Sequence, residues 1–145
     1  MLKIVFDTSF LLEVRRGNII AQEEFKKSIE NASDIGISII TLYELYLGAF
    51  LYYLRRHDPS ELDWLEKILG WLTIYPVNTK TAEIAAKIKA ELSLKGLNIS
   101  DSDILIATSA GPGTTLLTFD SDHESIKDIL SHYNITVVYL EKKNK

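Results

Sequence analysis

Acidic residues lie next to several apolar segments of this sequence. Asp7 directly follows the apolar residues 2–6, and Asp120 comes two residues after Leu117-Thr118. Glu44 and Asp103 lie near the starts of two segments with helix-forming character. Carboxylates brought together repel one another, so their clustering is costly unless a cation compensates. Mg²⁺ and similar hard cations prefer oxygen ligands, and they support phosphodiester chemistry by activating water and polarising a phosphoryl group.

Each acid also has a purely structural interpretation. Asp103, together with Asp101, could complete a helix N-terminus after Ser100. Asp122 could be an N-cap, and a lone carboxylate such as Glu44 on an apolar helix usually reaches towards solvent. Asp7 could likewise cap the helix that follows it. The metal-site hypothesis therefore depends on whether these acids converge.

Hydroxyl and imidazole groups are the other candidates for chemistry. Ser9 and Thr118 could orient a metal-bound water, or they could satisfy nearby backbone groups. The histidines, His57, His123 and His132, fall in predicted loops or on the outer side of predicted helices. Because a metal can activate water itself, we expect no catalytic role for them.

The elements that must position these groups alternate along the chain. Apolar, β-branched runs predict buried strands, and apolar spacing of three or four residues predicts helices. Residues 20–29 place Ile20, Phe25 and Ile29 on one helical face, and Ser60 and Ser100 are predicted N-caps. The predicted strands are 2–6, 35–40, 73–77, 115–118 and 135–139, and the further predicted helices are 41–56, one following Pro59, 79–95, one through 104–110, and 122–133.

This alternation predicts an α/β fold with a mainly parallel sheet covered on both faces. In such sheets a ligand binds beyond the carboxyl ends of the strands, at the point where the strand order reverses. Asp7 and Asp120 both follow strands, so we expect them at the same edge of the sheet. Glu44 and Asp103, each on the first turn of a predicted helix, could reach the same point.

Composition sets limits on the function. The chain has 145 residues, 46% of them hydrophobic, which favours one domain over residues 1–140 followed by a charged tail, 141–145. It has no cysteine, which excludes a disulfide framework, a zinc ribbon and a cysteine nucleophile. No segment suits a membrane span or a signal peptide, so we expect a cytoplasmic protein.

The net charge of −4 argues against a nucleic-acid partner, because phosphate binding normally needs a basic surface. The acidity is local, however, if six acids converge on one site. Removing their charges leaves +2 for the remaining surface. The six residues are Asp7, Glu44, Asp101, Asp103, Asp120 and Asp122.

Four motifs in order, FDTSFLLE, TLYEL, SDSDILIATSA and LLTFDSD, resemble the PIN-domain family, especially its VapC-type toxins. The resemblance spans nearly the whole chain. It implies an acidic metal-binding and catalytic quartet in which Asp103 is chosen over Asp101 because ILIATSA follows it. Thr118 is then the hydroxyl partner of the fourth acid. The implied quartet is Asp7, Glu44, Asp103 and Asp120, with Asp101, Asp122, Ser9 and Thr118 as accessory candidates.

The resemblance also implies a three-layer α/β/α fold with a five-stranded sheet and Mg²⁺- or Mn²⁺-dependent endoribonuclease activity. Homodimers are frequent in this family, and its toxins have a cognate antitoxin. Two departures fall outside the quartet: Ser9 stands where Asn is common, and Asp122-His123 replaces a frequent Asp-Phe.

Surface residues suggest how partners could bind. Arg15 and Arg16, on the helix after Asp7, are candidates for binding RNA. An aromatic stripe is too apolar all round for core packing alone, so part of it is predicted to be a dimer or antitoxin interface. The stripe comprises Tyr43, Tyr46, Phe50, Tyr53, Trp64 and Trp71.

Other functions share parts of this pattern. A haloacid-dehalogenase-type phosphotransferase needs a second acid two residues after Asp7, where this chain has Ser9. A receiver-like domain needs an adjacent acidic pair, where Thr8 follows Asp7. An RNA-processing nuclease that is not a toxin, or an inactive interaction module, stays open at this stage.

Overall fold

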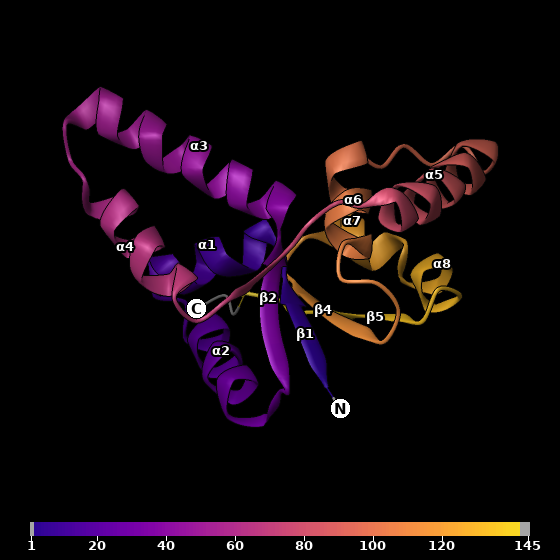
Figure 1. Ribbon diagram of the computed structural model, residues 1–145, viewed down its shortest axis with the longest axis horizontal. Coiled ribbons are helices and arrows are strands. Elements are labelled where there is room, and N and C mark those ends of the chain that lie inside the picture. The colour runs from indigo at the N-terminus through magenta and orange to yellow at the C-terminus, as the bar shows by residue number, and fades with distance from the viewer. Residues whose placement is uncertain (1, 143–145) are drawn as a thin grey trace.

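The computed structural model describes residues 2–142, which form one five-stranded sheet in the order β3-β2-β1-β4-β5 (Figure 1). All four neighbouring pairs are parallel, as the alternating pattern predicts. The apolar runs form the strands because parallel strands are buried on both faces. The strands are β1 (Lys3–Phe6), β2 (Asp34–Ser38), β3 (Thr73–Tyr75), β4 (Thr114–Thr118) and β5 (Ile135–Tyr139).

Helices cover both faces of this sheet, so the three-layer α/β/α architecture is confirmed. The face covered by α1–α4 buries Phe6, Phe10 and Ile37, and the face covered by α5–α8 buries Ile88 and Leu116. On the first face lie α1 (Thr8–Arg16), α2 (Ile19–Asn31), α3 (Ile39–Arg56) and α4 (Ser60–Leu69). On the other lie α5 (Thr79–Leu94), α6 (Asp101–Thr108), α7 (Ser121–Ser125) and α8 (Lys127–Ser131).

The strand order reverses between β1 and β4. The chain runs outward from β1 to β2 and β3, and then crosses to β4 and β5 on the other side of β1. The pairing of β1 with β4 continues to the edge of the sheet, where the Asp7 amide donates to the Leu117 carbonyl at 3.2 Å. The carboxyl ends of β1 and β4 therefore lie side by side at the reversal point, where parallel sheets bind ligands.

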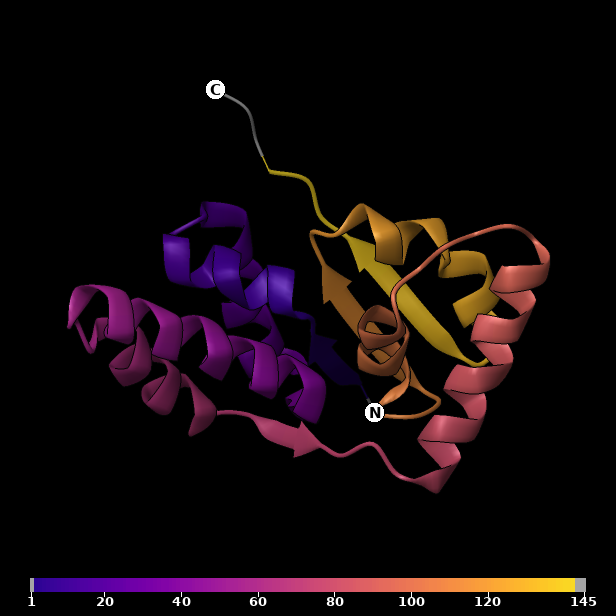
Figure 2. The same ribbon diagram turned by 90° about the horizontal axis from the view of Figure 1, so that it is seen from above.

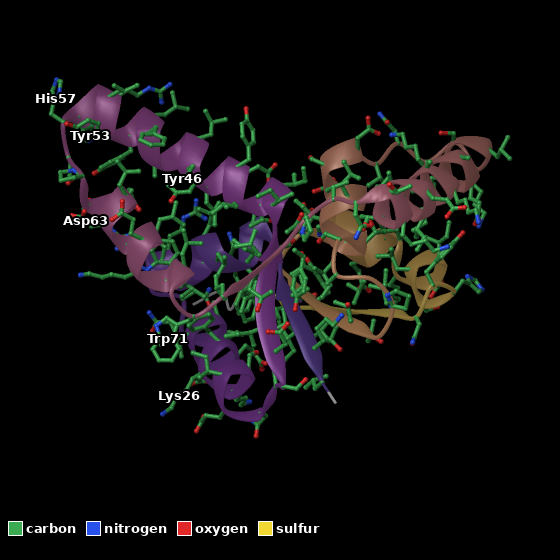
Figure 3. All side chains as sticks on the ribbon, in the orientation of Figure 1. Lys26, Tyr46, Tyr53, His57, Asp63 and Trp71 are labelled. Carbon is green, nitrogen blue, oxygen red and sulfur yellow. The ribbon has the colours of Figure 1, made fainter. Side chains whose placement is uncertain are left out.

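Helices α3 and α4 form a hairpin, here called the arm (residues 39–69), which extends away from the sheet (Figure 2). Figure 3 shows His57 at the turn between the two helices, at the outer end of the arm. His57 adopts a left-handed conformation there (φ 55°) and ends α3. The sheet end of α3 is the part of the arm that adjoins the edge with Asp7.

Two predicted boundaries at the ends of strands are wrong. The second strand ends at Ser38, whose hydroxyl accepts from the Ile40 amide at 3.1 Å and caps α3. Ile39 and Ile40 are therefore helical despite their β-branched side chains, and Glu44 lies on the second helical turn, not the first. The third strand ends at Tyr75, two residues earlier than predicted.

Four further predictions concern helices. The single helix predicted over 122–133 is two short helices, α7 and α8, because Ile126 leaves helical geometry at φ −111°. Ser60 is the first residue of α4 and not its cap, whereas the Ser100 cap is confirmed by its bond from the Asp103 amide at 3.2 Å. In α2, Ile29 is exposed, so the predicted apolar face is only partly buried.

The end of the described chain contacts the first helix. Lys142 lies 3.2 Å from the buried carboxylate of Glu13. The rest of the predicted charged tail, residues 143–145, lies outside the described residues. Across residues 2–142, none of the helices has the length and apolar character needed to cross a membrane.

Candidate metal centre

A pocket of about 430 Å³ opens at the carboxyl edge of the sheet, beside β1 and β4. Its walls come from four separated segments: the start of α1, the middle of α3, the first turn of α6, and the segment after β4. Each segment contributes one of the predicted acids. The lining acids are Asp7, Glu44, Asp103 and Asp120.

Asp7 is the most enclosed of these acids, with 2% of its surface exposed. Its Oδ1 accepts from the Phe10 amide at 2.8 Å and from the Ser9 hydroxyl at 2.7 Å. Its Oδ2 accepts from the Thr118 hydroxyl and from His123 Nδ1, the latter at 2.9 Å. A carboxylate has about four lone-pair directions, so these four donors use them all. Asp7 is thus both the α1 cap and a lining residue of the pocket.

The hydroxyls of Ser9 and Thr118 are used inside the protein. Besides donating to Asp7, Ser9 accepts from the Phe119 amide at 3.0 Å, and Thr118 accepts from the Asp120 amide at 2.9 Å. The two hydroxyls therefore tie the segment after β4 to the carboxylate that follows β1. This geometry matches the backbone-satisfying interpretation.

Glu44 is held by the start of α1. The Thr8 hydroxyl donates to Glu44 Oε1 at 2.5 Å and lies 3.2 Å from the hydroxyl of buried Thr41. One oxygen of Glu44 is thereby fixed towards the pocket. Glu44 lies one turn further along α3 than predicted, and with this contact it still lines the pocket.

Asp103 and Asp120 are the more open pair. Each offers an oxygen within 4.8 Å of the other and of a ring nitrogen of His123. Burial raises the pKa of the Asp103 carboxyl above its ordinary value, and the negative charges of Asp120 and Asp122 act in the same direction. Two half-buried carboxylates this close are stabilised by a bound cation.

His123 is the residue that sequence reasoning missed. The prediction that it lies on the outer side of a helix is wrong: it is 1% exposed and is one of the residues that line the pocket. Its Nδ1 faces Asp7 Oδ2 at 2.9 Å, and its Nε2 faces the Asp103 backbone carbonyl at 3.0 Å. Burial alone would lower its pKa, but the hydrogen bond and charge of Asp7, with the Asp103 groups, raise the pKa to about 9.

The other two histidines lie where the sequence suggested. His57 ends α3 and His132 ends α8, and both are exposed. A periodic signal for His123 existed, because His123, Ile126 and Leu130 stand three and seven residues apart, as on one buried helical face, and all three are buried.

Comparison with known proteins agrees with this geometry. Residues 4–129 match the sequence model of the family described as the PIN domain. The chain belongs to the PIN-domain family. A ribonuclease named VapC2 from Haemophilus influenzae is 34% identical over 110 residues, covering 76% of this chain and 80% of the relative. The phosphotransferase and receiver-like alternatives are therefore discarded.

Solved structures show the same fold. The VapBC2 structure from Rickettsia felis, bound to a promoter DNA fragment, superposes with a TM-score of 0.75 at 24% identity, covering 97% of this chain and 100% of that one. A DNA-bound VapBC from Salmonella typhimurium superposes with a TM-score of 0.72 at 25% identity, covering 96% and 98%.

The donor set of this PIN domain fits a hard divalent cation. The pocket offers carboxylate oxygens, and the described residues hold no thiolate that would favour a softer metal. His123 lies within ligand distance, but both of its nitrogens face acceptors and act as donors. In that state it has no lone pair left for a metal, so the candidate ligands at this centre are the carboxylates.

Two of the predicted accessory acids do not line the pocket. Asp101 is exposed and pairs with Lys89 at 3.3 Å, and Asp122 is exposed with its amide bonded to Asp120. Neither lines the pocket. Of the six acids considered in the charge argument, four line the pocket, and the charge of Asp122 still acts on Asp103.

The two predicted RNA-binding arginines lie beside a neighbouring cleft of about 280 Å³ between α1 and the arm. Arg15 pairs with Glu61 at 2.8 Å and stacks over Trp64, and Arg16 pairs with Glu13 at 2.7 Å. The cleft shares Thr8, Glu44 and Gly48 with the metal pocket, so the two hollows adjoin.

Proposed function

We propose that this PIN domain is a Mg²⁺- or Mn²⁺-dependent endoribonuclease and the toxin of a VapBC-type toxin-antitoxin pair. The observation that carries the proposal is the arrangement of the four acids, Asp7, Glu44, Asp103 and Asp120, around one pocket at the strand-order reversal. The relatives named VapC ribonuclease support the choice of RNA as substrate. This substrate also favours a cytoplasmic location.

The four carboxylates of this centre have different roles. Asp103 and Asp120 offer oxygens within 4.8 Å of each other, while the Thr8 hydroxyl holds one oxygen of Glu44. The Asp7 carboxylate accepts four hydrogen bonds, which immobilise it. It can bind a cation directly only if the cation displaces one of these donors. A bound cation of this kind lowers the pKa of its water and polarises the phosphoryl group, so no histidine base is needed.

Substitution of single carboxylates tests the proposal. Asp7→Asn and Asp103→Asn each remove one charge with little change in size, and we expect RNA cleavage with Mn²⁺ to fall by at least about a hundredfold. Asp101→Asn is the matched control, because Asp101 is an exposed acid of the same helix that does not line the pocket. Cleavage by both test variants at the parental rate would show that the mechanism is wrong.

The surface of the arm and the names of the relatives together suggest which partners bind. The outer surface of the arm exposes apolar side chains that do not pack in the core, and aromatic residues are enriched at interfaces. Two solved neighbours are complexes of the VapBC type. We therefore propose that the arm surface binds a second copy of the chain or an antitoxin. The exposed apolar side chains of the arm that lie outside the hollows include Tyr43, Phe50, Tyr53 and Leu54. Leu47 and Leu51 are exposed but line the metal pocket, and exposed Trp71 lies just beyond the arm. Tyr46 and Trp64 of the predicted stripe are half-buried.

The predicted RNA contacts of Arg15 and Arg16 stay part of this proposal. Arg16 has 62% of its side chain exposed and can reach phosphate while keeping Glu13 as a neighbour. Arg15 is more enclosed, at 34%, and its guanidinium is committed to Glu61. Arg16 is therefore the better candidate of the two.

A further inference from the structure

His123 connects the two sides of the metal centre. One ring nitrogen donates to the carboxylate of Asp7, which follows β1, and the other donates to the backbone carbonyl of Asp103, on α6. These two acids are 96 positions apart in the sequence, and no hydrogen bond between them is present within residues 2–142. The imidazole is therefore a direct polar link between them.

The geometry of this link is tightly constrained. His123 is 1% exposed and Asp7 is 2% exposed, so water cannot replace a lost bond without opening the core. The Nε2 of His123 also lies 4.0 Å from the Asp103 carboxylate, which places the ring under the open pair of acids. A buried side chain with both donors satisfied fixes the positions of the groups it bonds.

We propose that His123 is a positioning residue that holds the Asp7 carboxylate and the Asp103 main chain at the separation the metal requires. It is not a ligand, and its burial keeps it from touching RNA. The inference rests on the proposed function of the site for its activity readout. Its metal-binding readout does not depend on that function.

Three substitutions separate the two bonds. His123→Phe keeps a planar ring and removes both donors. His123→Asn places an amide nitrogen near the position of Nδ1 and can keep the bond to Asp7. His123→Gln places its amide nitrogen nearer Nε2 and favours the Asp103 carbonyl. His132→Phe is the matched control, because His132 is an exposed histidine at the end of α8.

The first readout is Mn²⁺ binding to metal-free protein, followed by electron paramagnetic resonance. We expect His123→Phe to raise the midpoint Mn²⁺ concentration by about tenfold, the size of effect usual for groups that orient metal ligands. Removing the His123 donors would by itself leave the neighbouring oxygens freer to bind a cation, which would lower the midpoint. A raised midpoint therefore reports that the carboxylates have lost their orientation. His123→Asn and His123→Gln each keep one of the two bonds, so their midpoints should fall between those of His123→Phe and the parent. His132→Phe should match the parent.

The second readout is RNA cleavage at saturating Mn²⁺. We expect kcat to fall by about tenfold in His123→Phe while KM for RNA is unchanged. Equal or tighter Mn²⁺ binding with parental kcat in His123→Phe would overturn the positioning role. If His123→Phe does not fold, Mn²⁺ binding that is weakened in both the Asn and the Gln variants supports the positioning role, and parental Mn²⁺ binding in both variants overturns it. If the parent cleaves no RNA, the proposed function fails, and the Mn²⁺ titrations still decide the role of His123.

Discussion

Gly48→Ala should stabilise this protein and weaken its hold on RNA. Gly48 lies in the interior of α3 and lines the metal pocket, the cleft beside α1 and a third hollow near the end of the arm. A Cβ built on Gly48 would meet no atom within 4 Å. No packing contact in the described residues therefore requires a glycine, and the added methyl would occupy the space where the three hollows meet.

The stability change follows from helix propensity. Gly is about 1 kcal/mol less favourable than Ala in a helix interior, and no clash offsets the gain. For a chain of 145 residues, this corresponds to a rise in Tm of about 3 °C. Thermal unfolding of Gly48→Ala in EDTA measures this term without metal or RNA. An unchanged or lowered Tm would refute the helix argument.

The binding change depends on the path of the RNA. If the strand leaves the metal pocket along α3, the methyl lies against it, and we expect KM to rise about fivefold with little change in kcat, a cost of about 1 kcal/mol. Gly70→Ala, at the end of α4 and outside these hollows, is the matched control. An unchanged KM in Gly48→Ala would show that RNA does not pass over this residue.

Three further outcomes are expected. Phe6→Ala should cost about 3–5 kcal/mol in urea unfolding, because Phe6 is fully buried and stacks on Phe10 at 4.7 Å. Burial raises the pKa of Glu13, but bonds from Arg16 and Lys142 bring it below the ordinary value. That stabilisation is complete above the unfolded pKa and lost as pH falls through the folded one, so Glu13→Gln should lower Tm at neutral pH by more than it does in acid. Leu54→Asp, on the exposed arm, should shift any dimer to monomer in sedimentation.

The fold was largely predictable because its signals are local. Buried parallel strands give continuous apolar runs, and these runs determine the alternation of strands and helices. The errors fall where a local cap outweighs propensity. Ile39 and Ile40 look like strand residues, but the Ser38 hydroxyl caps a helix that starts there. Ile126 is apolar and periodic, and only tertiary packing shows that it separates α7 from α8.

The arrangement of the site could be anticipated only in part. The ends of β1 and β4 place Asp7 and Asp120 at one edge, and the sequence alone leads to that conclusion. Asp103 lines the pocket and Asp101 does not, because only one side of α6 faces the pocket. The sequence at the start of a short helix does not show which side this is. The only signal for the burial of His123 was its spacing from Ile126 and Leu130, and this signal is weak because His123 is polar and its helix is short.

The number of acids in the pocket determines the net charge of the remaining surface. Four acids, not six, line the pocket, so removing their charges from −4 leaves zero for the rest of the chain. The surface therefore supplies no general attraction for RNA, and binding must depend on where cations are placed. Arg15 and Arg16 already pair with Glu61 and Glu13.

Two arginine side chains that are not paired with acids in the described part of the chain lie further along α3. Arg55 and Arg56 make no ion pair within residues 2–142, and they line the third hollow together with Gly48 and Leu51. The metal pocket also contains Gly48 and Leu51, so one continuous surface of α3 leads from the carboxylates to these arginines. Phosphates held by Arg55 and Arg56 would draw the strand across Gly48, which is why a single methyl there is expected to affect KM more than kcat.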